Sequence, residues 1–120
     1  MPNETTEVFE TFARDIPGFI AASLVDLDSG MTLAVKSTRS DFDLAVASAY
    51  NSELVKQKLK VMKALNLTTT LEDVIFTLGD QIHLLKILSP TTFIYLAADR
   101  AAANIAIVRN IVGKHAHRVA

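Results

Sequence analysis

The sequence predicts a small α/β domain of the α+β type, with helices and strands in the order α-β-β-α-β-β-β-α. Three observations support this prediction. Apolar residues recur at helical spacing near the start, the middle and the end of the chain, and five short runs rich in aliphatic residues lie between them. Glycine, proline and aspartate separate these runs at spacings that suit hairpins. The length of 120 residues fits one domain, expected over residues 1–120.

The first half of the chain predicts a short helix followed by a hairpin. Apolar spacing marks the helix over residues 4–16, and a Pro-Gly pair ends it. The continuous apolar run over residues 19–25 is typical of a strand that is buried on both faces. A turn over residues 26–30 then leads into a return strand over residues 31–35.

The second half predicts three strands and a final helix. The strands are expected over residues 71–78, 82–88 and 92–98, with Gly-Asp and Ser-Pro pairs between them. Asp99 is the expected cap of a helix over residues 100–113, which has one apolar stripe. These three strands therefore form two successive antiparallel hairpins.

Composition excludes several classes of function. The net charge of −1 offers no basic field for nucleic acid, so no nucleic-acid partner is expected. The apolar runs are much shorter than the ~20 residues that cross a bilayer, and the acidic first ten residues do not resemble a signal peptide. We therefore expect a cytoplasmic protein without membrane insertion. The hydrophobic share of 50% is high for a soluble domain and hints at burial against another chain.

The middle helix, expected from a cap at Ser40 or Asp41 to about Leu65, has two neighbouring apolar sides. One side consists of Ala47, Tyr50, Leu54, Val61 and Leu65, and the other consists of Leu44, Val55, Leu59 and Met62. The remaining, solvated face holds Ser52, Glu53, Lys56, Gln57, Lys60 and Lys63. One sheet needs an apolar stripe of only ~100°, and this helix has about twice that width.

Two interpretations of the second apolar side remain open. Loops and the other helices can cover it within one chain. Alternatively, the side of Leu44, Val55, Leu59 and Met62 packs on the same helix of a twin subunit about a two-fold axis, and this is the interpretation we favour. The lysines of the solvated face can serve solubility or can dock an acidic partner.

Candidate metal sites have weak support in the sequence. Residues 26–30 start like a calcium loop, but the spacing of oxygen ligands is wrong and a hairpin turn explains them better. His115 and His117 are two residues apart and cannot share a ligand on a helix. There are no cysteines to hold a metal. We expect no metal and no cofactor.

Candidate catalytic residues are equally few. His83 most simply occupies one face of a strand, without an acidic or hydroxyl partner fixed by spacing. Arg39 and Arg100 can be imagined as arginine fingers, although solvated or structural roles carry more weight. No glycine-rich phosphate loop is present. The sequence therefore predicts a protein that is not an enzyme.

Three local patterns, in this order along the chain, resemble the roadblock/dynein light-chain family. Residues 18–30 (GFIAASLVDLDSG) are similar to the opening hairpin of that family. Residues 71–79 (LEDVIFTLG) resemble its third strand, and residues 96–106 (LAADRAAANIA) resemble the junction of its last strand and last helix. Together the patterns span most of the chain.

The resemblance implies a five-stranded antiparallel sheet with the middle helix on one face and the terminal helices on the other. It also implies a homodimer, or a pair with a paralogue, in which middle helices pack together and third strands join edge to edge. Val74 and Phe76 would otherwise form an unguarded edge. The expected interface comprises Leu44, Ala47, Asn51, Val55, Leu59, Met62, Val74 and Phe76.

Bacterial roadblock proteins are partners of small Ras-like GTPases, so the resemblance implies a non-catalytic homodimeric regulator or scaffold for such a GTPase. The expected docking residues are Glu53, Lys56, Gln57, Lys60 and Lys63. The alternative is a ligand-sensing module of the profilin, longin or PAS kind. A deep polar-lined pocket would favour the sensor, and a filled core beneath a flat two-fold surface would favour the platform.

Overall fold

The computed structural model describes residues 3–119; Met1, Pro2 and Ala120 of the expected domain lie outside this range. Five antiparallel strands form one sheet in the order β2-β1-β5-β4-β3. The elements are α1 (Glu4–Asp15), β1 (Phe19–Asp26), β2 (Thr32–Ser37), α2 (Leu44–Ala64), β3 (Asp73–Thr77), β4 (Gln81–Ser89), β5 (Thr92–Asp99), α3 (Ile105–His115) and the 3-10 turn η1 (Ala116–Arg118). The predicted order and the antiparallel sheet are confirmed.

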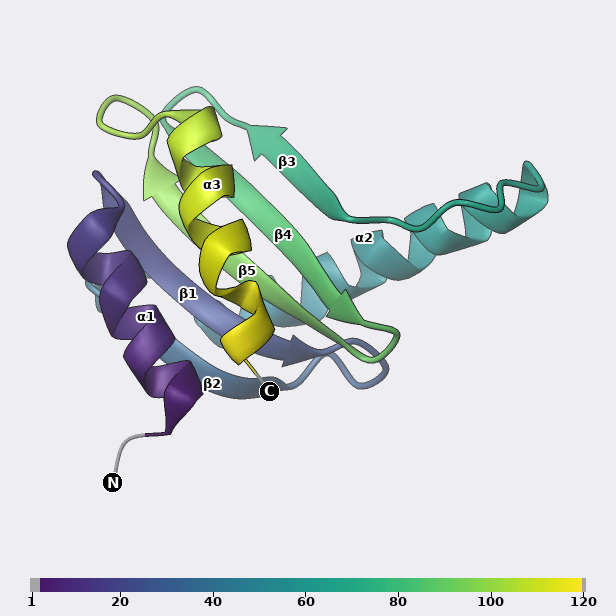
Figure 1. The fold of residues 1–120 in the computed structure, drawn as a ribbon, viewed down its shortest axis with the longest axis horizontal. Helices are drawn as coiled ribbons and strands as arrows, with labels where there is room; N and C mark the ends of the chain where they lie inside the picture. The colour runs from purple at the N-terminus through teal and green to yellow at the C-terminus, as the bar shows by residue number, and fades with distance from the viewer. Residues whose placement is uncertain (1–2, 120) are drawn as a thin grey trace.

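The sheet lies between two helical layers, with α1 and α3 on one face and α2 on the other (Figure 1). Phe9 and Phe12 of α1 and Val112 of α3 pack with Leu96 of β5 in the first core. Leu44 and Val55 of α2 pack with Leu85, Phe93 and Tyr95 in the second. The arrangement expected of the helices is confirmed, and β1 is buried on both faces along nearly its whole length. Among residues 3–119, no helix combines the length and apolar character needed to cross a bilayer.

Two helices begin later than the sequence pattern predicts. The N-cap of α2 is Asp43, whose carboxylate accepts a hydrogen bond from the Val46 amide at 3.0 Å, whereas Ser40 and Asp41 precede the helix. The N-cap of α3 is Asn104, and Asp99 instead accepts from the Ala101 amide in a separate turn. Several residues with capping side chains stand close together at each site, and tertiary packing selects among them.

The C-terminus of α2 ends in a Schellman motif. Asn66 has a positive φ of 56°, and the amides of Asn66 and Leu67 donate to the carbonyls of Lys63 and Met62. This turn sends the chain back beside α2 toward β3 (Figure 1). The last turns of α2 therefore extend beyond the sheet, and their side chains are covered only in part by their own chain.

Gly18 precedes β1 in a conformation that requires glycine. Its φ is +78°, and a Cβ atom placed on it would lie 2.9 Å from the Cβ of Ala102 and 3.0 Å from the carbonyl oxygen of Asp99. The Asp99 amide donates to the Gly18 carbonyl at 2.7 Å, so this contact joins β1 to the end of β5. Only a residue without a side chain fits there.

Gly18→Ala is expected to lower the free energy of unfolding by about 1–2 kcal/mol from the positive φ alone, and further through the clash with Ala102. Chemical denaturation measures the change. Gly79→Ala is the matched control, because a Cβ there meets no atom within 4 Å and the backbone has no positive φ. Equal stability of the two variants would contradict this account of Gly18.

Candidate functional site

The sheet-facing side of α2 contains four of the residues expected at a contact with a twin subunit. Leu44, Asn51, Val55 and Met62 are 1–8% exposed within the single chain. This corrects the predicted orientation of the helix, since the side assigned to a second chain is mostly the side that packs on the chain's own sheet. The correction does not extend to Leu59, which is 39% exposed.

Two serines explain the orientation of α2. The Ser48 hydroxyl is buried and lies 3.0 Å from the Ser23 hydroxyl of β1. The buried Ser52 hydroxyl donates to the Leu27 carbonyl at the end of β1. Each hydroxyl has a hydrogen-bond partner, so burial carries little penalty, and the small side chains let the helix approach the sheet closely. A hydropathy pattern counts both serines as solvated, which is why the rotation of the helix was not predicted.

The opposite side of α2 presents an exposed apolar surface, which we call the outer apolar face. It consists of Val46, Tyr50, Leu54, Val61 and Leu65, which are 39–72% exposed. Ala47 is half-buried at its border. An exposed apolar stripe along about five turns of one helix is the kind of feature that marks a protein–protein contact.

The outer apolar face continues onto β3, the outermost strand on its side of the sheet. Val74 and Phe76 are half-buried and point to the same face of the sheet as α2. A hollow of about 390 Å³ between helix and strand is lined by Leu54 and Lys58 together with these two residues. Helix and strand edge therefore form one surface.

The expected docking residues lie on another flank of α2. Glu53, Gln57, Lys60 and Lys63 are exposed. Lys56 is half-buried, because its ammonium donates to the Asp28 carbonyl at 2.9 Å and lies 3.4 Å from the Glu53 carboxylate. Within residues 3–119, Lys60 and Lys63 form no ion pair. This flank is therefore basic, and its exposed lysines can contact a partner.

A second hollow, of about 490 Å³, lies between the overhanging half of α2 and the sheet. Leu27, Leu59, Met62, Leu71 and Ile87 line much of it. Its volume is in the range of small-molecule sites. Its lining is largely aliphatic, whereas a polar lining was the feature expected of a ligand sensor.

A polar hollow of about 350 Å³ lies where β1 begins and β5 ends, and Arg39 and Asp80 contribute to its lining. Arg39 donates two hydrogen bonds to the Asp41 carboxylate, at 3.2 and 3.0 Å, and these bonds lower the pKa of that carboxyl. Arg100 donates to the Leu78 carbonyl at 3.1 Å. Both arginines imagined as nucleotide fingers thus have structural contacts, which favours the simpler interpretation of them.

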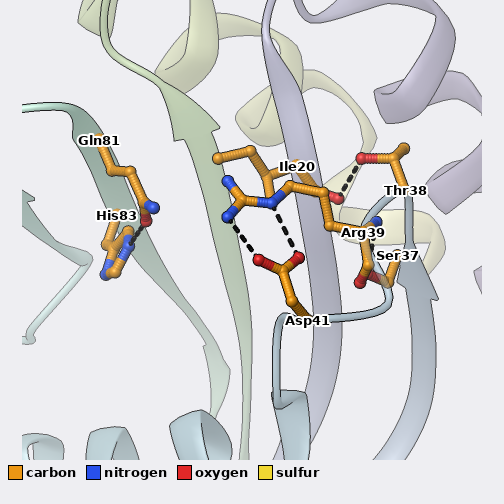
Figure 2. A network of polar contacts seen from close by, with 7 residues as sticks. All are labelled: Ile20, Ser37, Thr38, Arg39, Asp41, Gln81 and His83. Carbon is orange, nitrogen blue, oxygen red and sulfur yellow. Dashed lines mark hydrogen bonds and ion pairs between the residues drawn. The ribbon is translucent and has the colours of Figure 1, made fainter.

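An aromatic cluster lies on the α2 side of the sheet. The ring of His83 is 5.3 Å from the ring of Tyr95, and Phe42 stacks on Tyr95 at 6.4 Å. His83 Nε2 lies 2.7 Å from Gln81 Oε1, as Figure 2 shows. Burial lowers the pKa of His83, with nearby Asp80 acting in the opposite direction, and burial raises the pKa of Tyr95. The cluster is therefore neutral at pH 7.

The residues that the sequence offers as candidate metal ligands have other roles. Asp26 accepts a hydrogen bond from the Ser29 amide at 3.0 Å, as in a hairpin turn. His115 packs edge-on against Phe12 in the last turn of α3. Among the described residues, no group of three histidine, aspartate or glutamate side chains could hold a metal ion.

Lowering the pH below about 6.5, the ordinary pKa of histidine, is expected to reduce the free energy of unfolding. The fold favours the neutral His83 ring, so the unfolded chain takes up the proton more readily and stability is lost as the pH falls. Denaturation at a series of pH values measures this. His83→Gln should remove this part of the pH dependence, and His117→Gln, at an exposed position, should retain it. Identical profiles for wild type and His83→Gln would show that another group is responsible.

No protein-family model and no curated protein sequence matches the chain. Solved structures do match. A Roadblock/LC7 domain from Streptomyces avermitilis is 15% identical with a TM-score of 0.80, covering 92% of this chain and 89% of that one. The gliding protein MglB from Thermus thermophilus is 16% identical with a TM-score of 0.82, covering 97% and 85%.

Two further MglB structures are similar. Myxococcus xanthus MglB is 12% identical with a TM-score of 0.83, covering 93% of this chain and 88% of that one. A structure described as MglB with tetrameric arrangement is 18% identical with a TM-score of 0.81, covering 92% and 81%. Element order, sheet and helix placement agree with this similarity. The chain has the roadblock/LC7 fold, in the form seen in MglB.

Proposed function

We propose that this chain is a non-catalytic homodimer that regulates or scaffolds a small Ras-like GTPase. The observation that carries the proposal is the outer apolar face of α2, which is exposed and continuous with the edge of β3. Support comes from the shared fold with MglB and from the tetrameric arrangement named for one MglB structure.

The dimer contact joins two outer apolar faces about a two-fold axis. Full burial of a large apolar side chain stabilises by about 1.5–3 kcal/mol, and the members of this face are about half exposed, so each gains roughly 1 kcal/mol. Pairing of β3 with its two-fold mate satisfies the free backbone groups of that edge. In this proposal Val46, Tyr50, Leu54 and Val61 take the place of the buried residues of α2 in the expected interface. Ala47, Val74 and Phe76 remain in the interface, whereas Leu59 lines the hollow between α2 and the sheet and does not.

The basic flank of α2 is the docking surface for the GTPase. Lys60 and Lys63 are exposed and form no ion pair within residues 3–119. An acidic patch on a partner can therefore pair with both lysines without first breaking an ion pair inside that part of the chain. Such complementarity mainly raises the rate of association and sets specificity. Two-fold pairing of the helices doubles this surface.

The aliphatic hollow of about 490 Å³ favours a second candidate function, binding of a small apolar ligand between α2 and the sheet. In this alternative the protein is a ligand sensor of the profilin, longin or PAS kind. A ligand found there in the isolated dimer would favour the sensor.

Tyr50→Glu combined with Leu54→Glu is expected to convert the dimer into a monomer at low protein concentration. The substitutions place charges at the centre of the outer apolar face, where each side chain is at least half exposed and the fold itself is little affected. Light scattering coupled to size exclusion gives the mass, and circular dichroism verifies folding. Val55→Glu and Met62→Glu are unsuitable, since both residues are buried. A double variant that remains dimeric at the same low concentration would place the contact elsewhere.

Lys60→Glu combined with Lys63→Glu is expected to leave the dimer intact and to weaken GTPase binding several-fold, more so at low salt. Titration calorimetry with small Ras-like GTPases of the same organism, loaded with GDP or a GTP analogue, measures the affinity. Lys114→Glu on α3 is the control, since this exposed lysine lies on the other face of the sheet. The absence of binding in both nucleotide states would refute the GTPase proposal.

A further inference from the structure

The edge opposite β3 also exposes apolar side chains. Met31, Leu33 and Val35, along and just before β2, are 66%, 57% and 58% exposed, more than the half-buried residues of β3. We call these three residues the β2 strip. In a folded domain, large aliphatic side chains at this level of exposure on an edge strand are usually covered or guarded.

The backbone of β2 is also unpaired on its outer side. The Thr38 amide donates to the Ile20 carbonyl at 2.9 Å, and hydrogen-bonded pairs alternate along an antiparallel ladder. Lys36 opposite Ala22 is therefore a bonded pair, and the N–H and C=O of Val35 and Ser37 point away from β1. The register shifts only next to the hairpin, between Leu24 and Val25, so the edge is regular from residue 34 onward.

On the face of β2 that carries the β2 strip, no charged side chain of this strand opposes pairing with another strand. Its only charged residue, Lys36, points to the α1 face and pairs with Glu10 at 3.0 Å. Antiparallel pairing of β2 with β2 of another copy, centred on Val35, places Val35 opposite Val35 and Lys36 opposite Ala34. Like charges do not meet, and two valines face each other at a position where β-branched pairs are favourable.

Spacing identifies a second copy, rather than a lone peptide strand, as the occupant. The first half of α2 lies over β1 through the Ser48–Ser23 contact, and the helix then crosses the sheet toward β3 (Figure 1), so the following spacing applies near Ser48. With strands about 4.8 Å apart, β2 pairing sets the two β1 strands about 14 Å apart. Helices about 10 Å across then leave a gap of roughly 4 Å, which the side chains of the two β2 strips fill. A single peptide strand brings no second helix and leaves the strip exposed.

The residues of α2 that border this gap have small side chains. A Cβ on Gly30 would lie 3.2 Å from the Cα of Ala49, so that side of α2 faces the start of β2. Ala45 lies one turn earlier on the same side of the helix. Both alanines are exposed, and neither obstructs a second helix.

We propose that β2 is a second self-association surface, at which β2 of another copy pairs antiparallel about a two-fold axis at Val35 while its α2 closes over the β2 strip. The contact lies at the opposite edge of the sheet from β3 and does not depend on the proposed GTPase function. Because both edges can be occupied together, dimers joined through α2 and β3 associate further through β2 into tetramers and longer assemblies.

Val35→Lys places two lysines directly opposite each other on the two-fold axis, and Val35→Glu does the same with carboxylates. Each variant alone is expected to need at least about tenfold higher concentration than wild type to form species larger than the dimer. A mixture of the two should restore those species, since lysine then faces glutamate. Light scattering over a wide range of concentrations measures the masses. Ile107→Lys, at an exposed position on α3, is the matched control and should behave as wild type.

The Tyr50→Glu, Leu54→Glu background separates this contact from the α2 and β3 contact. In that background β2 pairing alone should give a concentration-dependent dimer, which Val35→Lys abolishes and mixing with Val35→Glu restores. Wild-type protein that never exceeds the dimer at high concentration would overturn the proposal. The proposal would also be overturned if Val35→Lys and Val35→Glu formed larger species as readily as wild type. A mixture of the two variants that did not restore the larger species would overturn it as well.

Discussion

The packing of α2 on β1 through small hydroxyl side chains determines which surfaces this protein can offer to others. Ser48 meets Ser23 at 3.0 Å in the buried layer, and Ser52 donates to the end of β1. These contacts rotate the helix so that Val55 and Met62 point inward, and Tyr50 and Leu54 point outward. The cost of burying a hydroxyl is offset only when its partner is in place, so the two serines hold one rotation of the helix.

That rotation has consequences at both edges of the sheet. On the β3 side, Leu54 borders the hollow lined by Val74 and Phe76, so helix and strand edge form one apolar surface. On the β2 side, α2 presents Ala45 and Ala49, whose size leaves the β2 strip uncovered. Both edges of the sheet therefore carry apolar residues beside free backbone groups. Proteins usually guard such edges with charge, and here the one charged side chain of β2 is turned toward α1.

Much of the fold could be predicted from the residues, because hydrophobic period and turn chemistry are local. The buried run of β1, the Pro-Gly stop after α1 and the hairpin turn before Gly30 are all read from neighbouring residues. The N-caps of the helices could not be predicted in this way. For α2, Asp41 and Asp43 are chemically equivalent candidates, and Asp43 is the cap because the Asp41 carboxylate accepts hydrogen bonds from Arg39 instead. The sequence predicted that α2 has an apolar side not needed by its own sheet, but it did not predict which side of the helix that is. Hydropathy treats Ser48 and Ser52 as solvated, and only their hydrogen-bond partners, in β1 and directly after it, reveal which side of α2 is covered.

The two proposed contacts and the docking flank are compatible in space, because α2 is longer than the part of the sheet it covers. Ser48 and Ser52 anchor the first half of the helix over β1, where the gap beside β2 lies. Lys60 and Lys63 belong to the last turns, which extend beyond the sheet (Figure 1). Antiparallel pairing through β2 directs these two lysine-bearing ends in opposite directions, so a partner that binds the lysines does not compete with association at the sheet edge. The overhang of α2 thus keeps the proposed docking surface apart from the proposed contact at the β2 edge.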